Sequence, residues 1–407
     1  MKIKLRDYQK DAISFHLNKR WSYNAYKVGY GKTIMALESA RVSQASRICV
    51  VAPAYLVEQW VEASKNWDVS CFIFSYDKFQ KIDTAESFDF YIFDEAHYLK
   101  NWTTKRTKFV YSHLSKNIKA FRLFLSGTPF KNEVSDLYPL LRLTDFDHTF
   151  MIKYPTLWMF QTEFANKYSF FIGSREITQF KGLKKDKVSA LQTLLRKVMI
   201  RNKPEDDLKL PERTRTLLNF KLKERLTSPL SLETLKDIEN GTLAHLMAIK
   251  CKIALSHVEF TVSRALEVLE EKDKLLIYSD HIDPVLEIYR ELKAKGVRCS
   301  YIVGSVDTGD RNEVTEDFRN TDLQVVVATI GAYSTGLNLQ FCNHTIFNDM
   351  PWIPASVEQA EGRTYRSGQD MPTFFDYVVS DSVQGEIFKV VTRKSKQQKE
   401  VIDNGLN

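Results

Sequence analysis

The sequence lacks the features that mark membrane, secreted and zinc-binding proteins. No apolar run approaches the ~18 residues that a membrane-spanning helix needs. Charged residues interrupt the first positions, where a signal peptide would carry an apolar stretch. None of the five cysteines forms a C-x-x-C pair, and most lie in apolar, strand-like runs. We therefore expect a cytoplasmic protein without a zinc site, a disulfide framework or a membrane contact.

The charge of the chain is only mildly biased. Of the 407 residues, 43% are hydrophobic and 27% are charged, which is typical of a soluble globular protein. The formal net charge of +7 permits a nucleic-acid partner without requiring one. The length suits two or three domains.

Short apolar runs alternate with helical stretches in two separate parts of the chain. Because such alternation forms parallel sheets that helices cover on both faces, it predicts an α/β fold with two lobes. We assign residues 1–145 to the first lobe, 146–250 to a mostly helical insert with a linker, and 251–407 to the second lobe. The expected strands are Ile48–Ala52, Cys71–Ser75, Phe90–Phe93 and Leu123–Ser126, then Leu275–Ser279, Cys299–Val303, Val325–Thr329, Thr345–Phe347 and Phe374–Val379.

The insert begins with a run rich in aromatic residues, before its charged helical stretches. These aromatics have two interpretations, a small core of their own or a platform on which nucleic-acid bases stack. The pattern favours the small core. The residues concerned are Trp158, Phe160, Phe164, Tyr168, Phe170 and Phe171.

A glycine-rich stretch, G-Y-G-K-T, precedes a helical pattern near the start of the chain. Gly29 and Gly31 permit a tight turn that presents backbone N–H groups to phosphate oxygens. Lys32 would reach the β and γ phosphates of a nucleoside triphosphate, and the Thr33 hydroxyl would bind Mg²⁺. The stretch also fits a simple turn that opens a helix. It predicts a site for ATP and Mg²⁺.

Asp94 and Glu95 follow an apolar run, F-D-F-Y-I-F, later in the same lobe. Asp94 would bind the same Mg²⁺ through its water shell, and Glu95 would orient and deprotonate the attacking water. An alternative is a solvated acidic pair that caps a helix. The strand-like run favours the first interpretation, because parallel sheets bind ligands at the carboxyl ends of their strands.

Taken in order, the motifs resemble those of superfamily 2 helicases, and among these the Swi/Snf-type DNA translocases and the fork-remodelling relatives found in phages. The resemblance covers almost the whole chain, the insert least, and implies two RecA-like lobes. Its matching stretches are L-R-D-Y-Q (5–9), K-V-G-Y-G-K-T (27–33), V-V-A-P-A-Y-L-V-E-Q-W (50–60), S-Y (75–76), D-E-A-H-Y-L-K-N (94–101), L-S-G-T-P-F-K-N (125–132), L-I-Y-S-D-H (276–281), S-T-G-L-N-L (334–339) and Q-A-E-G-R-T-Y-R-S-G-Q (359–369).

The resemblance implies roles for further residues. Gln9 would read the adenine edge, and three residues of the first lobe would couple the γ phosphate to the lobe interface: Ser126, Thr128 and His97. Polar groups that would contact DNA phosphates are equally consistent with turns. They are Ser75, Tyr76 and Lys131 in the first lobe and Thr329, Thr335 and Asn338 in the second.

Arg363 and Arg366 are three residues apart, so on a helix they share one face. Their guanidinium groups present forked donors that suit phosphate oxygens. On a separate lobe they would meet the triphosphate only when the lobes close, as an arginine finger does. The simpler alternative is two arginines in solvent, and the flanking Gln359 and Gly362 favour the finger. Gln359 therefore joins the predicted catalytic set.

We predict an ATP-dependent DNA translocase or helicase that moves on duplex, forked or branched DNA without reading its sequence. It would serve replication, recombination or repair as a monomer in a bacterial or phage-infected cytoplasm, with a recruiting protein still unidentified. One alternative is an RNA helicase. Another is an ATP-binding structural or targeting subunit with little turnover, which the intact Lys32, Asp94, Glu95 and Arg366 disfavour.

Overall fold

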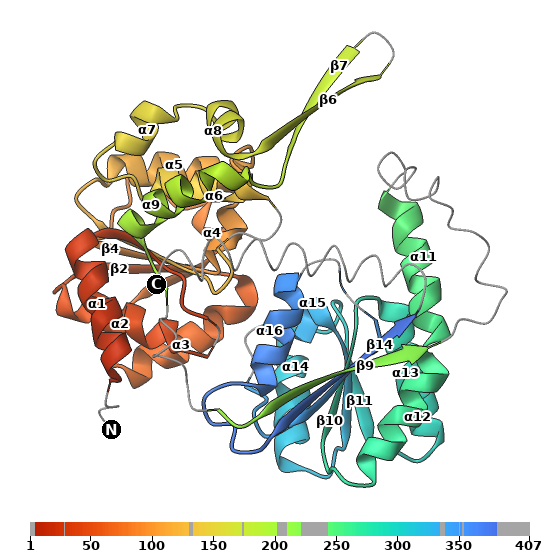
Figure 1. Ribbon diagram of the computed structural model, residues 1–407. Helices are drawn as coiled ribbons and strands as arrows, with labels where there is room; N and C mark the ends of the chain where they lie inside the picture. The colour runs from red at the N-terminus through yellow and green to blue at the C-terminus, as the bar shows by residue number, and fades with distance from the viewer. Residues whose placement is uncertain are drawn as a thin grey trace. The chain divides into compact units, whose positions relative to one another are not determined.

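The computed structural model describes residues 5–27, 29–129, 133–172, 175–201, 210–220, 243–333, 338–349, 351 and 354–380. They fall into two compact units, the first reaching Arg201 and the second running from Leu210 to Ser380 (Figure 1). Within these ranges, no helix combines the length and the apolar character of a membrane span.

The first unit is built on a six-stranded sheet whose neighbouring strands all run parallel. In spatial order its strands are β3 (Phe72–Ser75), β2 (Ile48–Ala52), β4 (Phe90–Asp94), β5 (Phe121–Leu125), β1 (Trp21–Asn24) and β8 (Met199–Ile200). Its helices are α1 (Asp7–Lys19), α2 (Lys32–Val42), α3 (Val57–Asn66), α4 (Tyr76–Phe79), α5 (Lys105–Lys116), α6 (Leu137–Leu143), α7 (Thr149–Lys153), α8 (Leu157–Phe164) and α9 (Val188–Val198), with short 3-10 turns such as η2 (Ala96–Leu99) between them.

Both faces of this sheet are buried, because alternate residues of each strand join different cores. Along β4, Phe90 and Ile92 pack with α2 and α3, whereas Tyr91 and Phe93 pack with α5, α6, α8 and α9. The period of two places successive side chains on opposite faces. Strands buried on both faces read as continuous apolar runs, and this is why the sequence revealed them.

An antiparallel hairpin leaves the first unit between α8 and α9. It consists of β6 (Asn166–Ile172) and β7 (Arg175–Lys181), and it projects beyond the surrounding helices (Figure 1). Phe180 and Leu183, at its base, pack partly against the core of the first unit. The hairpin joins neither parallel sheet.

The second unit repeats the design with another six-stranded parallel sheet. Its strands, in spatial order, are β11 (Cys299–Ile302), β12 (Val325–Thr329), β10 (Leu275–Ser279), β13 (His344–Phe347), β14 (Thr373–Ser380) and β9 (Arg213–Phe220). One face packs on α12 and α13, and the other on α14, α15 and α16. The helices are α11 (Leu243–Ser256), α12 (Val258–Leu269), α13 (Ile282–Ala294), α14 (Thr308–Asn320), α15 (Ile330–Tyr333) and α16 (Pro354–Thr364).

The two parallel sheets confirm the predicted α/β class with two RecA-like lobes, and each expected strand appears within two residues of its predicted ends. The segment predicted as a mostly helical insert holds α7, α8 and α9, but it also holds the unexpected strands β6 to β9. Its described residues divide between the two units. The boundaries at residues 145 and 250 stay predictions.

Candidate nucleotide site

The glycine-rich stretch forms the turn between β1 and α2, and its glycines are needed for two physical reasons. Gly29 and Gly31 have φ angles of 89° and 80°, in the left-handed region that side chains disfavour. A Cβ on Gly31 would also lie 2.8 Å from the side-chain nitrogen of Gln9. The turn therefore has both the conformation and the tight packing expected of a phosphate-binding loop.

Gln9 braces this turn from α1. Its Oε1 accepts from the backbone N–H of Arg6 at 2.9 Å, which caps the helix, and its Nε2 donates to the carbonyl oxygen of Tyr30 at 3.3 Å. The predicted adenine reader thus lies directly against the phosphate loop. Its role towards adenine stays a prediction.

The Lys32 side chain folds back over its own loop. Its ammonium group donates to the carbonyl oxygens of Tyr26, at 2.8 Å, and Lys27, at 3.1 Å. Thr33 follows it, half-buried in the first turn of α2. An ammonium group and a threonine hydroxyl at the start of a helix are the donor and ligand that a triphosphate with a divalent cation requires.

Asp94 ends β4, where its carboxylate is held in a defined direction. Oδ2 accepts from the indole N–H of Trp60 and Oδ1 from the backbone N–H of Glu95, at 2.9 and 2.8 Å. Burial, followed by the charge of Glu95, raises the pKa of Asp94 to about 6, although the two hydrogen bonds and Lys32 act in the opposite direction. A carboxylate so poorly solvated would gain from a bound cation.

Glu95 adopts a left-handed backbone conformation, with φ 47° and ψ 49°, which is uncommon outside glycine. Its Oε2 lies 3.0 Å from Nδ1 of His97 and accepts from the Ser126 hydroxyl at 3.4 Å. Because a carboxylate only accepts, the contact with His97 requires the proton on Nδ1. Strain of this kind gathers at functional sites.

Ser126 and Thr128 follow β5 and meet the acidic turn, as the motif order predicted. Ser126 Oγ lies 3.1 Å from His97 Nδ1, so Glu95, His97 and Ser126 form one buried network. Thr128 Oγ1 is buried and has no hydrogen-bond partner among the described residues. Their coupling role stays a prediction.

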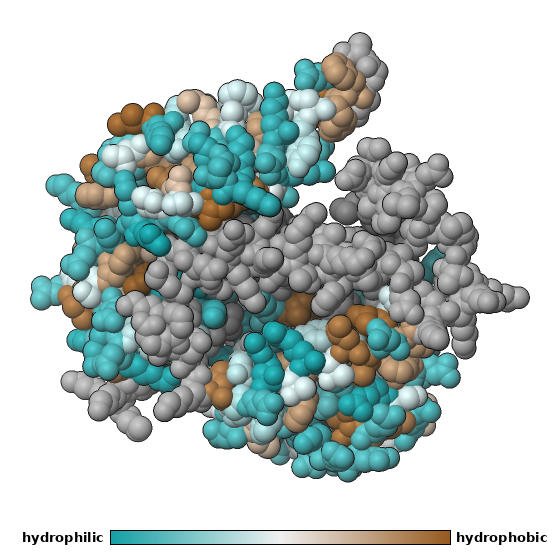
Figure 2. All heavy atoms as spheres, in the orientation of Figure 1, coloured by the Kyte–Doolittle hydropathy of each residue, from teal (hydrophilic) through white to brown (hydrophobic). Residues whose placement is uncertain are grey.

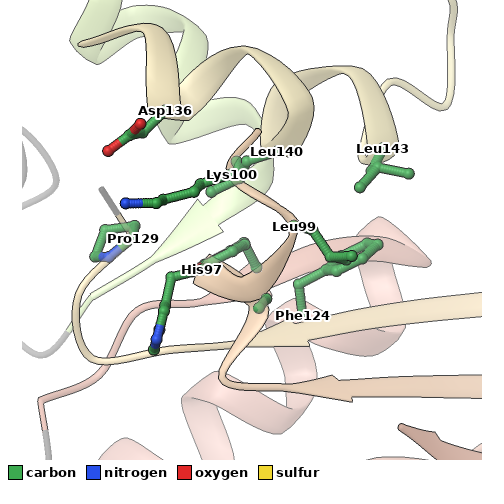
Figure 3. A pocket seen from close by; sticks show the side chains of 10 residues that line it. His97, Leu99, Lys100, Phe124, Pro129, Asp136, Leu140 and Leu143 are labelled. Atoms are coloured by element: carbon green, nitrogen blue, oxygen red, sulfur yellow. The ribbon is translucent and has the colours of Figure 1, made fainter. Parts of the chain in front are cut away.

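A small pocket adjoins His97 (Figure 3). His97, Pro129 and Phe124 line it together with α6, and Lys100 and Asp136 lie at one side. Gly29, Gly31, Lys32 and Thr33, all within the described residues, are not in its lining. The pocket is therefore space beneath the acidic turn and separate from the phosphate loop.

Ser75 and Tyr76 are buried, at 8% and 2% exposure. The Ser75 hydroxyl accepts from the backbone N–H of Lys78 and caps α4, while the Tyr76 hydroxyl donates to the carbonyl oxygen of Asp94 at 2.9 Å. Their side chains thus support the end of β4 in this structure. Their predicted DNA contact stays a prediction, and Lys131 lies outside the described residues.

In the second unit, α16 carries Gln359 and Arg363, both largely buried. The expectation that Arg366 continues the same helix is wrong, because α16 ends at Thr364 and Gly368 takes a φ of 95° in the turn that follows. Burial and repulsion from Arg363 lower the pKa of Arg366 to about 10.

The predicted DNA contacts of the second unit lie near these arginines and at a strand end. The Arg366 guanidinium donates to Oδ1 of Asn338, and Asn338 is exposed. Thr329 ends β12 and is buried, at 7% exposure. Thr335 lies outside the described residues, so its contact, like the others, stays a prediction.

Sequence reasoning missed two buried side chains of the first unit. Trp60 orients the Asp94 carboxylate, as described above. Arg201 donates to the carbonyl oxygen of Ala25, which directly follows β1. It also donates to the carbonyl oxygen of Gly127, at 2.9 Å, between the two predicted coupling residues. An arginine just after a short strand carries no local signal of such a position, since its partners are distant in sequence.

Comparison with known proteins identifies two families along the chain. Residues 71–229 match the SNF2-related domain, and residues 261–368 match the helicase conserved C-terminal domain. An uncharacterized ATP-dependent helicase of Bacillus subtilis, YqhH, is 27% identical over 91% of this chain and 74% of its own length. The DNA annealing helicase and endonuclease ZRANB3 of Mus musculus is 23% identical over 98% of this chain.

The chain spans only 40% of the length of that ZRANB3 protein. Among solved structures, the SWI2/SNF2 ATPase core of Sulfolobus solfataricus in complex with dsDNA is 19% identical, with a TM-score of 0.43, over 100% of this chain and 94% of that one.

Proposed function

We propose that this chain, which matches the SNF2-related domain over residues 71–229 and the helicase conserved C-terminal domain over residues 261–368, is an ATP-dependent motor that moves along duplex and branched DNA. YqhH is named as an ATP-dependent helicase, which supports ATP as the nucleotide. ZRANB3 is named as a DNA annealing helicase, which supports DNA as the substrate. The motor serves replication, recombination or repair.

In the proposed site, the phosphate loop and Lys32 bind the triphosphate. Thr33 and Asp94 hold Mg²⁺, which neutralises charge on the phosphates when bound. Glu95 accepts a proton from the attacking water, and its contact with His97 and the Ser126 hydroxyl fixes the direction of its carboxylate. Trp60 and the backbone N–H of Glu95 similarly orient Asp94.

The observation that carries this proposal is the arrangement at the end of β4. One carboxylate there is partly buried and held by two hydrogen bonds, and the next is held in a strained turn within a hydrogen-bonded network. Two adjacent carboxylates in different environments can divide cation binding and proton transfer between them. A turn that only caps a helix needs neither the strain nor the burial.

Turnover also requires Arg363 and Arg366 of the second unit, which stabilise charge on the transferring phosphoryl group. This requirement makes hydrolysis depend on both units, and the motor advances as the units alternately grip the DNA backbone. Contacts to phosphate carry no sequence information, so binding is independent of sequence and sensitive to salt. We propose that the protein acts as a monomer in the cytoplasm.

The test is the ATPase rate of the full chain, measured without nucleic acid and with single-stranded DNA, blunt duplex, forks, Holliday junctions and RNA. We expect stimulation by DNA, with Glu95→Gln as a matched variant that binds nucleotide but does not hydrolyse it. If RNA alone stimulated the ATPase, the substrate would be RNA and not DNA. No stimulation by any of them would favour a binding subunit.

A further inference from the structure

The aromatic residues of the segment between Asp147 and Lys181 divide into two groups. Phe160 and Phe164 are fully buried in the core of the first unit. By contrast, Tyr168, Phe170 and Phe171 of the β6–β7 hairpin are 54%, 36% and 70% exposed. The expectation that the aromatics of this run form a core is thus wrong for Trp158, which is 58% exposed, and for the hairpin, where a stacking platform is the alternative.

Exposed aromatic rings on a two-stranded ribbon need an explanation, because such a ribbon has no second layer in which to bury them. The base of the hairpin is anchored, since Phe180 packs on the core and the side-chain amide of Asn166 donates to the carbonyl oxygen of Leu183. Farther out along β6 the aromatic side chains are exposed, and Figure 2 shows hydrophobic residues on the projecting ribbon.

The register places these rings on both faces of the ribbon. Tyr168 and Phe170 share one face, and Phe171 points to the other, because successive side chains of a strand alternate. A ribbon with a ring on each face can stack against bases on either side of it. This arrangement suits a position between two separating strands.

Charge identifies the class of ligand. The hairpin, residues 166–181, contains three basic residues (Lys167, Arg175 and Lys181) and one acidic residue (Glu176), so it holds a net charge of +2. Basic groups beside exposed aromatic rings are the combination that binds unpaired nucleic acid, through phosphate attraction and base stacking. A protein partner would not require this excess of positive charge.

We propose that the β6–β7 hairpin binds unpaired DNA bases, with Phe170 and Phe171 stacking on them and Lys167 attracting the adjacent phosphates. The hairpin thereby directs the protein to forks and junctions in preference to uninterrupted duplex. This inference rests on the proposed function and specifies the DNA structure that the motor selects. Reading duplex through a groove would instead depend on polar side chains along the ribbon, whereas its outer end reads F-F-I.

The test compares the full chain with the double variant Phe170→Ala, Phe171→Ala. Equilibrium binding is measured by fluorescence anisotropy on a fork, on single-stranded DNA and on blunt duplex of equal length. Stacking of a base on an aromatic ring contributes about 1–3 kcal/mol, so we expect roughly tenfold weaker binding to the fork and the single strand. Binding to the blunt duplex should change by less than about twofold.

A second readout follows stacking itself. The fluorescence of 2-aminopurine placed at the branch point should change when the wild-type protein binds, and this change should disappear in the double variant. Phe171→Trp should preserve it and Phe171→Leu should lose it. Trp158→Ala is the matched control, because Trp158 is 58% exposed on α8 but lies outside the hairpin. Thermal melting verifies that each variant is folded.

An equal loss of affinity for fork and duplex DNA would overturn the inference. No loss of affinity for either would also overturn it, and would indicate that the hairpin binds a protein partner. These outcomes differ from failure of the proposed function. If DNA did not stimulate the ATPase of the wild-type protein, the motor itself would be wrong. If DNA stimulated it while the hairpin variants selected forks normally, only the hairpin proposal would fail.

Discussion

Each of the two sheets has a pair of carboxylates at its strand ends, and the two pairs differ in the positive charge beside them. In the first unit Asp94 adjoins Glu95, and in the second Asp349, after β13, adjoins Asp280, after β10. Burial raises the pKa of both Asp94 and Asp349, and in each case the neighbouring carboxylate adds to the rise.

The difference lies in where the nearest lysine points. Lys250 is buried and places its ammonium 2.8 Å from Oδ2 of Asp280, while the Ser279 hydroxyl donates to Asp349. Lys32 donates to carbonyl oxygens of its own loop, and its charge also lowers the pKa of Asp94. Ligand atoms of Asp280, His281 and Asp349 lie within 4.8 Å of one another, but Lys250 already supplies the cation there.

The comparison teaches that position at a strand end does not by itself make a catalytic site. In the second pair, the ammonium group of Lys250 supplies the positive charge. The first pair retains a need for positive charge that a bound cation can meet. We therefore place the proposed chemistry at the first sheet, with Arg363 and Arg366 as the predicted contribution of the second unit.

The largest effect expected from this assignment is in Arg366→Ala. Loss of an arginine finger lowers turnover by about 10³–10⁵-fold, so DNA-stimulated hydrolysis should vanish while nucleotide still binds. Stopped-flow phosphate release and a fluorescent ATP analogue measure the two. Persisting stimulation by DNA would show that the second unit has no part in the chemistry.

Glu95→Gln should lower turnover by about 10²–10⁴-fold with nucleotide binding intact, because the general base is lost. Lys32→Ala should instead weaken nucleotide binding. Asp280→Asn is the matched variant at the other sheet end, and it should retain turnover per folded molecule. Normal hydrolysis in Glu95→Gln, or its loss in Asp280→Asn, would reverse the assignment of the two pairs.

Lys250→Met tests the second pair. Removing the countercharge from a largely buried carboxylate pair should reduce the free energy of unfolding by about 2–4 kcal/mol. Denaturant titration of the full chain measures this, with Lys252→Met on the same helix as a control. An unchanged unfolding midpoint would mean that Asp280 and Asp349 do not depend on Lys250.

Asp94→Asn should show a smaller, pH-dependent effect. The folded pKa of about 6 exceeds the ordinary value of 3.8, so the folded state binds the proton more tightly. Ionised Asp94 therefore destabilises the fold above pH 6, and this cost disappears as the pH falls below 4. The variant should be more stable than wild type by about 1–3 kcal/mol at pH 8 and equal to it near pH 4. A difference independent of pH would contradict the role of burial.

Much of the fold could be predicted because strands buried on both faces leave continuous apolar runs. Ile48–Ala52, Leu275–Ser279 and Val325–Thr329 were expected with the bounds that the structure has. β1 and β9 were missed for a physical reason. W-S-Y-N and R-T-R-T-L-L-N-F have no such run, and pairing with β5 and β14 makes them strands.

The hairpin did leave a local signal, since Gly173 and Ser174 separate two runs rich in aromatic and β-branched residues. Charged helical stretches nearby obscured it. At the site, the motifs identified Gly31, Lys32 and Asp94, whose roles depend on local turns and strand ends. Trp60 and Arg201 could not be found in this way, because only the fold brings them to their partners.

The left-handed turn at Glu95 has a consequence for engineering. A glycine there would hold the same backbone at lower conformational cost, about 1 kcal/mol or more, yet it would have no carboxylate. Directed evolution of this chain for heat resistance alone would thus reward replacement of its proposed general base. Each round of selection should therefore include an ATPase assay, since one substitution can raise the melting temperature and abolish hydrolysis.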